Sequence, residues 1–181
     1  MVTGVQTCAL PISLQYNLGI NSKVTAGPGK LNAFALGSGN TIGGGSSGTD
    51  FIDDSYAGGG NNRLVGGTGA TRIIGGGGDT IAGGAGALQA EIKTGFGTET
   101  VNLSASGSAD GVRDVASVGG GTAATVTGFS TANDVIESAT NVTAGVFTGT
   151  STVVAGNTVL TFTDGNQMTI IGVTSGIKFT S

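Results

Sequence analysis

A nine-residue repeat, with glycines at its start and an aliphatic residue near its end, occupies the middle of this chain. Residues 57–65 read AGGGNNRLV and residues 66–74 read GGTGATRII. Residues 75–82, GGGGDTIA, lack one position, and a further unit begins at Gly83. A repeat of fixed period indicates a stack of equivalent units, because one unit alone cannot bury its apolar side chain. The sequence therefore predicts an all-β solenoid, a parallel β-roll or β-helix.

Each unit combines a glycine-rich turn with a short apolar strand. Clustered glycines supply the positive φ angles and the close backbone approach of a tight turn. The residues after each turn predict short strands whose central side chain points inward: 63–65, 72–74 and 80–82. Since stacked strands lie about 4.8 Å apart, the central aliphatic residues would line an interior ladder: Leu64, Ile73, Ile81 and, in less regular units, Ile42 and Ile52. We expect the roll to span residues 37–101.

The repeat resembles the nonapeptide GGxGxDxUx of RTX proteins, calcium-binding proteins that bacteria secrete by the type I route. Its glycine and aliphatic positions agree with that pattern over residues 57–82. Where the family has aspartate, this chain has Asn62, Thr71 and Asp79, with Asp50 in a less regular unit. The resemblance thus implies a β-roll that carries an incomplete set of calcium ligands.

The resemblance also implies where calcium would bind. In RTX rolls each ion lies between turns on the same side of the roll, held by aspartate carboxylates and glycine carbonyls. This arrangement suits a cation that prefers six or more oxygen ligands. Counting units along the chain places Thr41, Asn62 and Asp79 on one side, and Asp50, Thr71 and Leu88 on the other.

Asn62 and Asp79 form the predicted calcium site, because they place oxygen-bearing side chains in consecutive turns of one side. Glycine carbonyls would complete it: Gly58, Gly60, Gly76 and Gly78. One carboxylate cannot neutralise a divalent ion, so we expect Ca²⁺ to bind weakly, with a dissociation constant of ~10⁻⁴ to 10⁻³ M. The alternative is a metal-free roll in which Asn62, Thr71 and Asp79 only bond neighbouring turn amides.

Residues 124–181 predict a small antiparallel β cap. The run 125–136 (TVTGFSTANDVI) is similar to the segment that leaves the roll in many RTX proteins, and residues 156–173 look like their closing hairpin. Predicted strands cover residues 124–129, 134–137, 152–155, 158–163, 168–173 and 177–180. Such a cap would seal the end of the solenoid, and the resemblance implies that it carries an uncleaved export signal.

The closing hairpin has two competing registers. A two-residue turn at Asp164 and Gly165 is a strong local signal, but it would set Phe162 opposite Gln167. A three-residue loop, 164–166, pairs Phe162 with Met168 and Leu160 with Ile170. Because a slip of one residue turns every side chain to the other face, we predict the second register, which gives one apolar face.

Three segments lie outside the roll and the cap. Residues 2–12 match the translation of a sequencing-library adapter, so we interpret residues 1–13, with Cys8, as an artefact and expect the protein to continue upstream. Residues 14–36 alternate like strands around a turn and predict a degenerate piece of the roll or strands leading into it. Residues 102–123 are polar and glycine-rich and predict a loop.

Composition excludes several function classes. The chain has a net charge of -4 and a pI near 4.4, which leaves no basic patch for nucleic acid. It contains no apolar stretch long enough to span a membrane. Its mean hydropathy of +0.25 lies above the range of disordered linkers. The abundance of glycine (37 of 181 residues) with few charges suits an extracellular or cell-surface protein.

The residue inventory argues against catalysis. Histidine is absent and Cys8 is discounted, so a nucleophile would lack its usual base and zinc its usual ligands. Three pairs of carboxylates could act as acid and base: Asp53 with Asp54, Asp50 with Asp53, and Asp110 with Asp114. Aspartates in turns, however, usually bond their own backbone. Arg63 and Arg72 are expected to face solvent on one side of the roll.

Two functions remain open from the sequence. The first is a non-catalytic structural or adhesive C-terminal segment of a secreted or cell-surface RTX-like protein. Its partners would be the type I secretion machinery and components of the cell surface or matrix. The second is the secretion and calcium-binding module of a secreted enzyme, such as a protease, lipase or polysaccharide-modifying enzyme, whose catalytic domain lies upstream. The true upstream reading frame would distinguish them.

Overall fold

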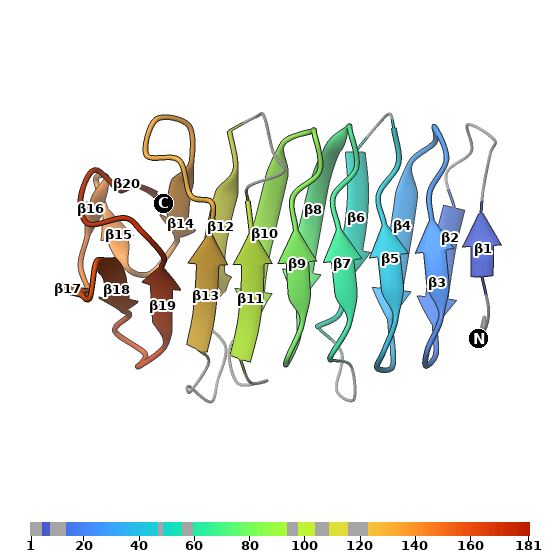
Figure 1. Cartoon of the computed structure of the whole chain (residues 1–181), viewed down its shortest axis with the longest axis horizontal. Helices are drawn as coiled ribbons and strands as arrows, with labels where there is room; N and C mark the ends of the chain where they lie inside the picture. The colour runs from blue at the N-terminus through green and yellow to red at the C-terminus, as the bar shows by residue number, and fades with distance from the viewer. Residues whose placement is uncertain are drawn as a thin grey trace.

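Two β-sheets face each other along the computed structural model, which describes residues 5–7, 14–46, 49–55, 60–93, 98–103, 109–115 and 123–181 (Figure 1). The first sheet has the spatial order β1 (Val5–Thr7), β3 (Lys23–Thr25), β5 (Thr41–Gly43), β7 (Arg63–Val65), β9 (Thr80–Ala82), β11 (Thr98–Asn102), β13 (Ala123–Thr127), β19 (Gln167–Ile170), β18 (Asn157–Thr161) and β17 (Thr150–Val154). The second sheet has the order β2 (Leu14–Leu18), β4 (Leu31–Ala35), β6 (Thr49–Asp53), β8 (Ala70–Gly75), β10 (Leu88–Lys93), β12 (Gly111–Val115), β14 (Val135–Ser138) and β20 (Lys178–Thr180). A separate small hairpin joins β15 (Val142–Thr143) and β16 (Val146–Phe147).

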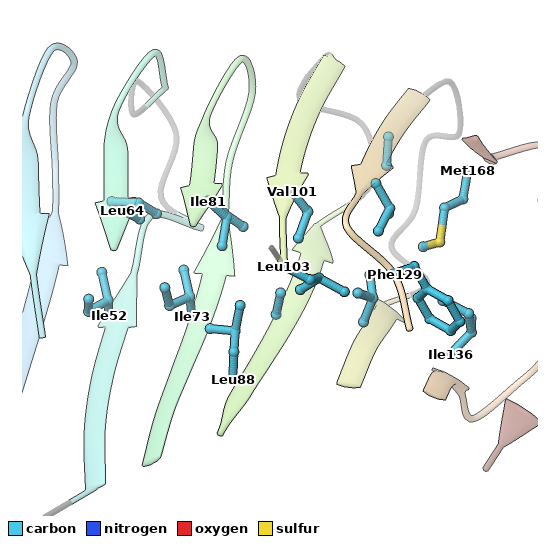
Figure 2. Close-up of a cluster of buried hydrophobic side chains, with 14 of the residues drawn as sticks. Ile52, Leu64, Ile73, Ile81, Leu88, Val101, Leu103, Phe129, Ile136 and Met168 are labelled. Carbon is cyan, nitrogen blue, oxygen red and sulfur yellow. The ribbon is translucent and has the colours of Figure 1, made fainter. Parts of the chain in front are cut away.

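Successive strands of the roll alternate between the two sheets, so two nine-residue units make one coil. Strands β5, β7 and β9 pair in parallel and place Ile42, Leu64 and Ile81 side by side. Strands β6 and β8 place Ile52 beside Ile73 in the opposite sheet. All five side chains are fully buried. The predicted parallel β-solenoid and its inward aliphatic residues are therefore confirmed, with the ladder divided into two rows that face each other (Figure 2).

Short strands suffice because each buries one apolar side chain in the space between the sheets. In β7 and β9 the central residue is buried and its neighbours are at least partly exposed, as the alternation of side chains along a strand requires. Burying one Leu or Ile stabilises the fold by about 1.5–3 kcal/mol. A single coil therefore gains little, and stacking many coils supplies the stability.

Glycine at one corner of the roll is required by the close approach of successive turns. Thr68 N donates to Gly45 O at 3.0 Å and Gly86 N donates to Gly67 O at 3.1 Å, so these turns bond backbone to backbone. A Cβ atom added at Gly84 would overlap the Gly67 carbonyl oxygen. This corner therefore has no room for a side chain.

The parallel stack is longer than the sequence predicts. Strands β2 and β4 pair in parallel and join β6, so residues 14–36 belong to the roll. The loop expected over residues 102–123 contains β12, which pairs in parallel with β10 and β14. Val112 is fully buried there and lies between Ala90 of β10 and Ile136 of β14, so the segment forms a strand because Val112 completes the core row. Residues 104–108 and 116–122 lie outside the described residues.

The predicted antiparallel cap closes one end of the roll. Strand β19 continues the first sheet in parallel with β13, and β18 and β17 follow antiparallel. Phe147 stacks on Phe179 at 5.1 Å between ring centroids and meets Phe162 edge-on at 5.3 Å. Phe162 comes from the chain just after β18 and Phe179 from β20 of the second sheet, so the three rings join the two sheets where the stack ends.

The hairpin register differs from the prediction by two residues. Leu160 lies opposite Met168, and Phe162 N donates to Asn166 O at 2.9 Å. The reason is that the three-residue loop lies one position earlier, at residues 163–165, where Gly165 N donates to Phe162 O at 3.0 Å and Gly165 takes a φ of 89°. Because a slip of two residues keeps each side chain on its face, the apolar face is correct although the predicted partners are wrong.

No helix long and apolar enough to cross a membrane occurs in the part of the chain that the structure describes.

The crowded corner gives a first testable prediction. Gly84→Ala should destabilise the roll by about 1–3 kcal/mol, because backbone must shift to accept the added methyl group. Gly43→Ala is the matched control: its added Cβ would have no neighbour closer than 3.8 Å, so its free energy of unfolding should change by less than about 0.5 kcal/mol. Urea denaturation followed by circular dichroism measures both, and equal effects would contradict the corner argument.

Candidate functional site

A buried polar residue precedes most of the short strands whose central side chain points into the core. In the first sheet these residues align as the first ladder: Ser22, Asn40, Asn62, Asp79 and Glu99. In the second sheet they align with two leucines as the second ladder: Leu31, Asp50, Thr71, Leu88, Asp110 and Asp134. These are the positions that the nonapeptide pattern GGxGxDxUx gives to aspartate, followed two residues later by the core aliphatic residue. Asn40 occupies the place predicted for Thr41, because Thr41 itself pairs with Arg63.

From Ser22 to Asp79, the first ladder joins consecutive coils by side-chain to backbone hydrogen bonds. Ser22 N donates to Asn40 Oδ1 at 2.8 Å, and Asn40 N donates to Asn62 Oδ1 at 2.7 Å. Asn62 N donates in turn to Asp79 Oδ1 at 2.8 Å. The second oxygen of Asp79 accepts from Gly76 N of its own turn at 2.9 Å. Each side chain thus satisfies a backbone N–H that the turn leaves unpaired.

The second ladder repeats this pattern at the other corner. Leu31 N donates to Asp50 Oδ1 and Leu88 N donates to Asp110 Oδ1, each at 2.9 Å. Asp110 N donates to Asp134 Oδ1 at 3.1 Å. Asp50 Oδ2 also accepts from Gly45 N of its own turn at 2.5 Å. The shared role of these residues is structural, since their oxygens close turns and connect coils.

The structure brings Asn62 and Asp79 together, as predicted, but engages their oxygens with amides. Both Asp79 oxygens and Asn62 Oδ1 accept backbone N–H groups, which would point at a cation bound to the same oxygens. Calcium needs six to eight oxygen ligands, and the described residues contain no cluster of three or more metal-type side chains. These residues therefore do not fit a calcium ion in this arrangement.

The glycines of the predicted calcium site serve the turns. Gly76 offers its N–H to Asp79, and its carbonyl accepts Asp79 N at 3.4 Å. Gly60 and Gly78 have φ angles of 127° and 80°, in the left-handed region that favours glycine. Gly58 lies outside the described residues.

Asp54 forms a second buried contact with this site, which the sequence did not reveal. Its side chain is 1% exposed, and Asn62 Nδ2 donates to its Oδ2 at 2.7 Å. Its Oδ1 is buried without a hydrogen-bond partner among the described residues, and Asp54 also shares a hydrogen bond with Asp79. Two carboxyl groups this close and this buried cannot both be ionised without a large cost.

The pKa values of the two acids reflect this burial. Desolvation raises the pKa of Asp54 to about 8, and the hydrogen bond and charge of Asp79 act in the same direction, whereas the Asn62 amide opposes them. Burial also raises the pKa of Asp79, against hydrogen bonds from Asp54 and from the amides of Gly76 and Asn62. At neutral pH Asp54 therefore holds a proton and donates it toward Asp79.

The carboxylate pairs considered for catalysis lie in turns and corners. Asp53 Oδ1 accepts Ser55 N at 2.8 Å, as in a turn that an aspartate closes on its own backbone. Asp50 and Asp110 belong to the second ladder, and the side chain of Asp114 lies outside the description. None of these described carboxylates is presented to solvent as an open pair, since all of them are buried.

An open groove of about 400 Å³ crosses the outer face of the second sheet between β6 and β14. Arg72 lies at one end with its guanidinium 5.5 Å from the ring centre of Phe51. Gln89 Nε2 donates to Glu137 Oε2 at 3.0 Å across it. Arg63 lies in the first sheet, so the prediction that Arg63 and Arg72 share one face is wrong, because consecutive units alternate between sheets.

No protein-family model matches the chain, and no curated protein or solved structure matches it either. Its function must therefore be argued from the geometry.

The buried acid pair predicts how stability depends on pH. The pKa of Asp54 rises from 3.8 to about 8 on folding, so between these values the folded protein holds a proton that the unfolded chain has lost. The free energy of unfolding should therefore decrease as the pH rises from about 4 to about 8, and then level off. At ~1.4 kcal/mol per pKa unit the decrease is on the order of several kcal/mol. Urea denaturation across this range measures it.

Asp54→Asn should flatten that profile, because an amide accepts from Asn62 and donates toward Asp79 as the protonated acid does. Asp53→Asn is the control: it removes the adjacent carboxylate and leaves the Asp54 and Asp79 pair in place. We expect the decrease to persist in this control. A profile that is equally steep in Asp54→Asn would show that another group is responsible.

Calcium should leave the stability of the roll unchanged, since its candidate ligands are engaged with amides. A site with a dissociation constant of ~10⁻⁴ M would instead add about 2.7 kcal/mol in ~10 mM CaCl₂. Thermal unfolding with calcium, with magnesium as the control for ionic strength, and with a chelator distinguishes these results. A rise specific to calcium would restore the predicted site.

Proposed function

We propose that this chain is a non-catalytic structural segment of a secreted or cell-surface RTX-like protein, a β-roll spacer ended by a cap. The observation that carries the proposal is the pair of ladders, in which side chains bond the backbone of the neighbouring coil at both corners. Bonds of this kind hold successive coils in one register. A stack built in this way keeps its ends at a fixed separation, as a spacer must.

The dimensions of the stack suit a spacer. Strands β3 to β13, which follow the segment interpreted as an artefact, provide six parallel strands of the first sheet, and with about 4.8 Å between neighbours they span about 24 Å. The acids that could have served catalysis are used within turns, which supports a structural role for them. An adhesive role is supported by the groove on the second sheet, where the side chains of Arg72, Gln89 and Glu137 project from a rigid surface.

The cap supports the export part of the proposal. The β-roll and its nine-residue repeat support a relationship to RTX-like proteins. The resemblance to that family implies an uncleaved C-terminal signal that a type I exporter recognises. In this chain that region is ordered: β19 and β20 each add a parallel strand to one of the two sheets. The same cap would equally serve a secreted enzyme with its catalytic domain upstream, and the calcium-binding part of that alternative is not favoured by the engaged ladder oxygens.

Export of a passenger tests this function. The full chain, fused behind a reporter and expressed with a type I exporter, should bring the reporter into the medium at the full mass of the fusion. Deleting residues 173–181 removes β20 and should abolish export. A fusion that ends in the same nine residues in scrambled order controls for length. Undiminished export of the deletion, or cleavage of the fusion, would contradict the proposed role of the cap.

A further inference from the structure

Strand β17 forms an open edge of the first sheet. Among the described strands it pairs with β18 alone, and it lies at the far left of the molecule in Figure 1. All five of its residues are exposed. The last strand of the second sheet, β20, contacts the small hairpin of β15 and β16 instead. The two sheets of the cap thus end differently, one beside a hairpin and one at an unpaired strand.

The register of the cap fixes which backbone groups of β17 point outward. Phe162 N donates to Asn166 O, so residues 158, 160 and 162 bond toward β19, and Asn157, Val159 and Thr161 bond toward β17. Their partners on β17 are Val154, Thr152 and Thr150, which use their N–H and C=O groups in that pairing. The N–H and C=O groups of Ser151 and Val153 therefore point away from the sheet.

The side chains of β17 do not protect this edge. Natural edge strands usually carry a charge, a proline or a bulge that prevents further pairing. The sequence of β17 is TSTVV, which has none of these, and both Val153 and Val154 are 56% exposed. A two-residue turn follows, with φ angles of 49° at Ala155 and 80° at Gly156, and the pairing with β18 runs without a bulge from Thr150 to Val154.

We propose that β17 pairs antiparallel with β17 of a second copy of this chain, about a two-fold axis at Thr152. Ser151 and Val153, whose backbone groups point outward, flank Thr152 and would exchange places under such an axis. Ser151 of each copy would lie opposite Val153 of the other, and their N–H and C=O groups would form four hydrogen bonds. The first sheets of the two copies would become one continuous sheet, and the two Val153 side chains would gain cover.

A second copy suits this edge because the contact brings no charges together. Each chain has a net charge of -4, but β17 is uncharged along its length, so like charges do not meet opposite one another. The pairing would join two spacers through their caps, and it rests on the strand register rather than on the proposed export. An experiment that contradicts export therefore does not contradict the self-pairing of β17, and the reverse also holds.

Sedimentation measurements on the full chain test the pairing. Five residues on each side make a small interface, below the usual size of stable complexes, so we expect reversible association within roughly 1 µM to 1 mM. Over this range, in reducing buffer, the weight-average mass should rise from 17.3 kDa toward twice that value. A mass that stays at 17.3 kDa at the highest concentration overturns the proposal.

Ser151→Pro should abolish this association and leave the fold intact. Proline removes the outward N–H, which has no role in the pairing with β18, and edge positions of this kind tolerate proline. Ser151→Thr is the control, because it keeps the N–H and should associate like the parent chain. Association of the folded Ser151→Pro variant at the parental level would overturn the proposal.

Cross-linking decides the register even if the proline variant fails to fold. In a background of Cys8→Ser, Thr152→Cys should form a disulfide-linked dimer on mild oxidation, because residues on the two-fold axis form a non-hydrogen-bonded pair with Cα atoms about 4.5 Å apart. Thr150→Cys is the control. In the proposed dimer residue 150 lies opposite Val154 of the second copy, so the two introduced cysteines would be too far apart to form a disulfide. Cross-linking of both variants alike, of neither, or of Thr150→Cys alone would overturn the proposed pairing.

Discussion

The hydrogen bond that a backbone N–H donates to a turn side chain of the following coil is the interaction on which this fold depends. Each coil contributes few buried aliphatic residues, so the core alone specifies the stacking loosely. The backbone N–H groups of Ser22, Asn40 and Asn62 each donate to the side chain of the next ladder residue, and these bonds fix the position of one coil relative to the next. They also satisfy N–H groups that glycine-rich turns would otherwise leave buried and unpaired, at a cost of about 1–3 kcal/mol each. Polar residues and core residues therefore act together, two positions apart in the sequence.

Burying the ladder has a consequence where two acids meet. Asp79 belongs to the first ladder, and Asp54, at the end of β6, reaches the same corner from the second sheet. Water is excluded there, and the Asn62 amide satisfies only one oxygen of Asp54. Holding a proton is the simplest way for such a pair to remain buried. Stability at this corner is thus tied to pH, although the residues involved have no catalytic arrangement.

Much of the roll could be predicted from the sequence, because its information is local. Leu64 and Ile81 follow their glycine clusters at a fixed distance, and this offset alone indicates which side chains point inward. The predicted loop at residues 102–123 missed β12 because the glycines around it vary in number, although Asp110 and Val112 repeat the spacing of polar and core aliphatic residues. The groove could not be predicted, since it depends on Gln89 meeting Glu137, 48 residues away, after several turns of unequal length. The contact between Asp54 and Asp79 could not be predicted for the same reason, because it depends on how the coils align.

The composition of the ladders lowers the electrostatic repulsion between neighbouring coils. Carboxylates in adjacent coils lie about 4.8 Å apart, and at an effective dielectric constant near 20 two such charges repel by roughly 3 kcal/mol. A cation between them would remove that repulsion, but neutral residues remove it as well. Ser22, Asn40 and Asn62 are neutral in the first ladder, and Thr71 and Leu88 separate Asp50 from Asp110 in the second. At Asp110 and Asp134, which follow one another in the second ladder, backbone N–H groups from the neighbouring coil and from Ser130 point at the carboxylates and supply part of the compensating positive charge. Replacing charge with amides and hydroxyls in the same positions lowers the repulsion between neighbouring coils and keeps the turn geometry of the repeat.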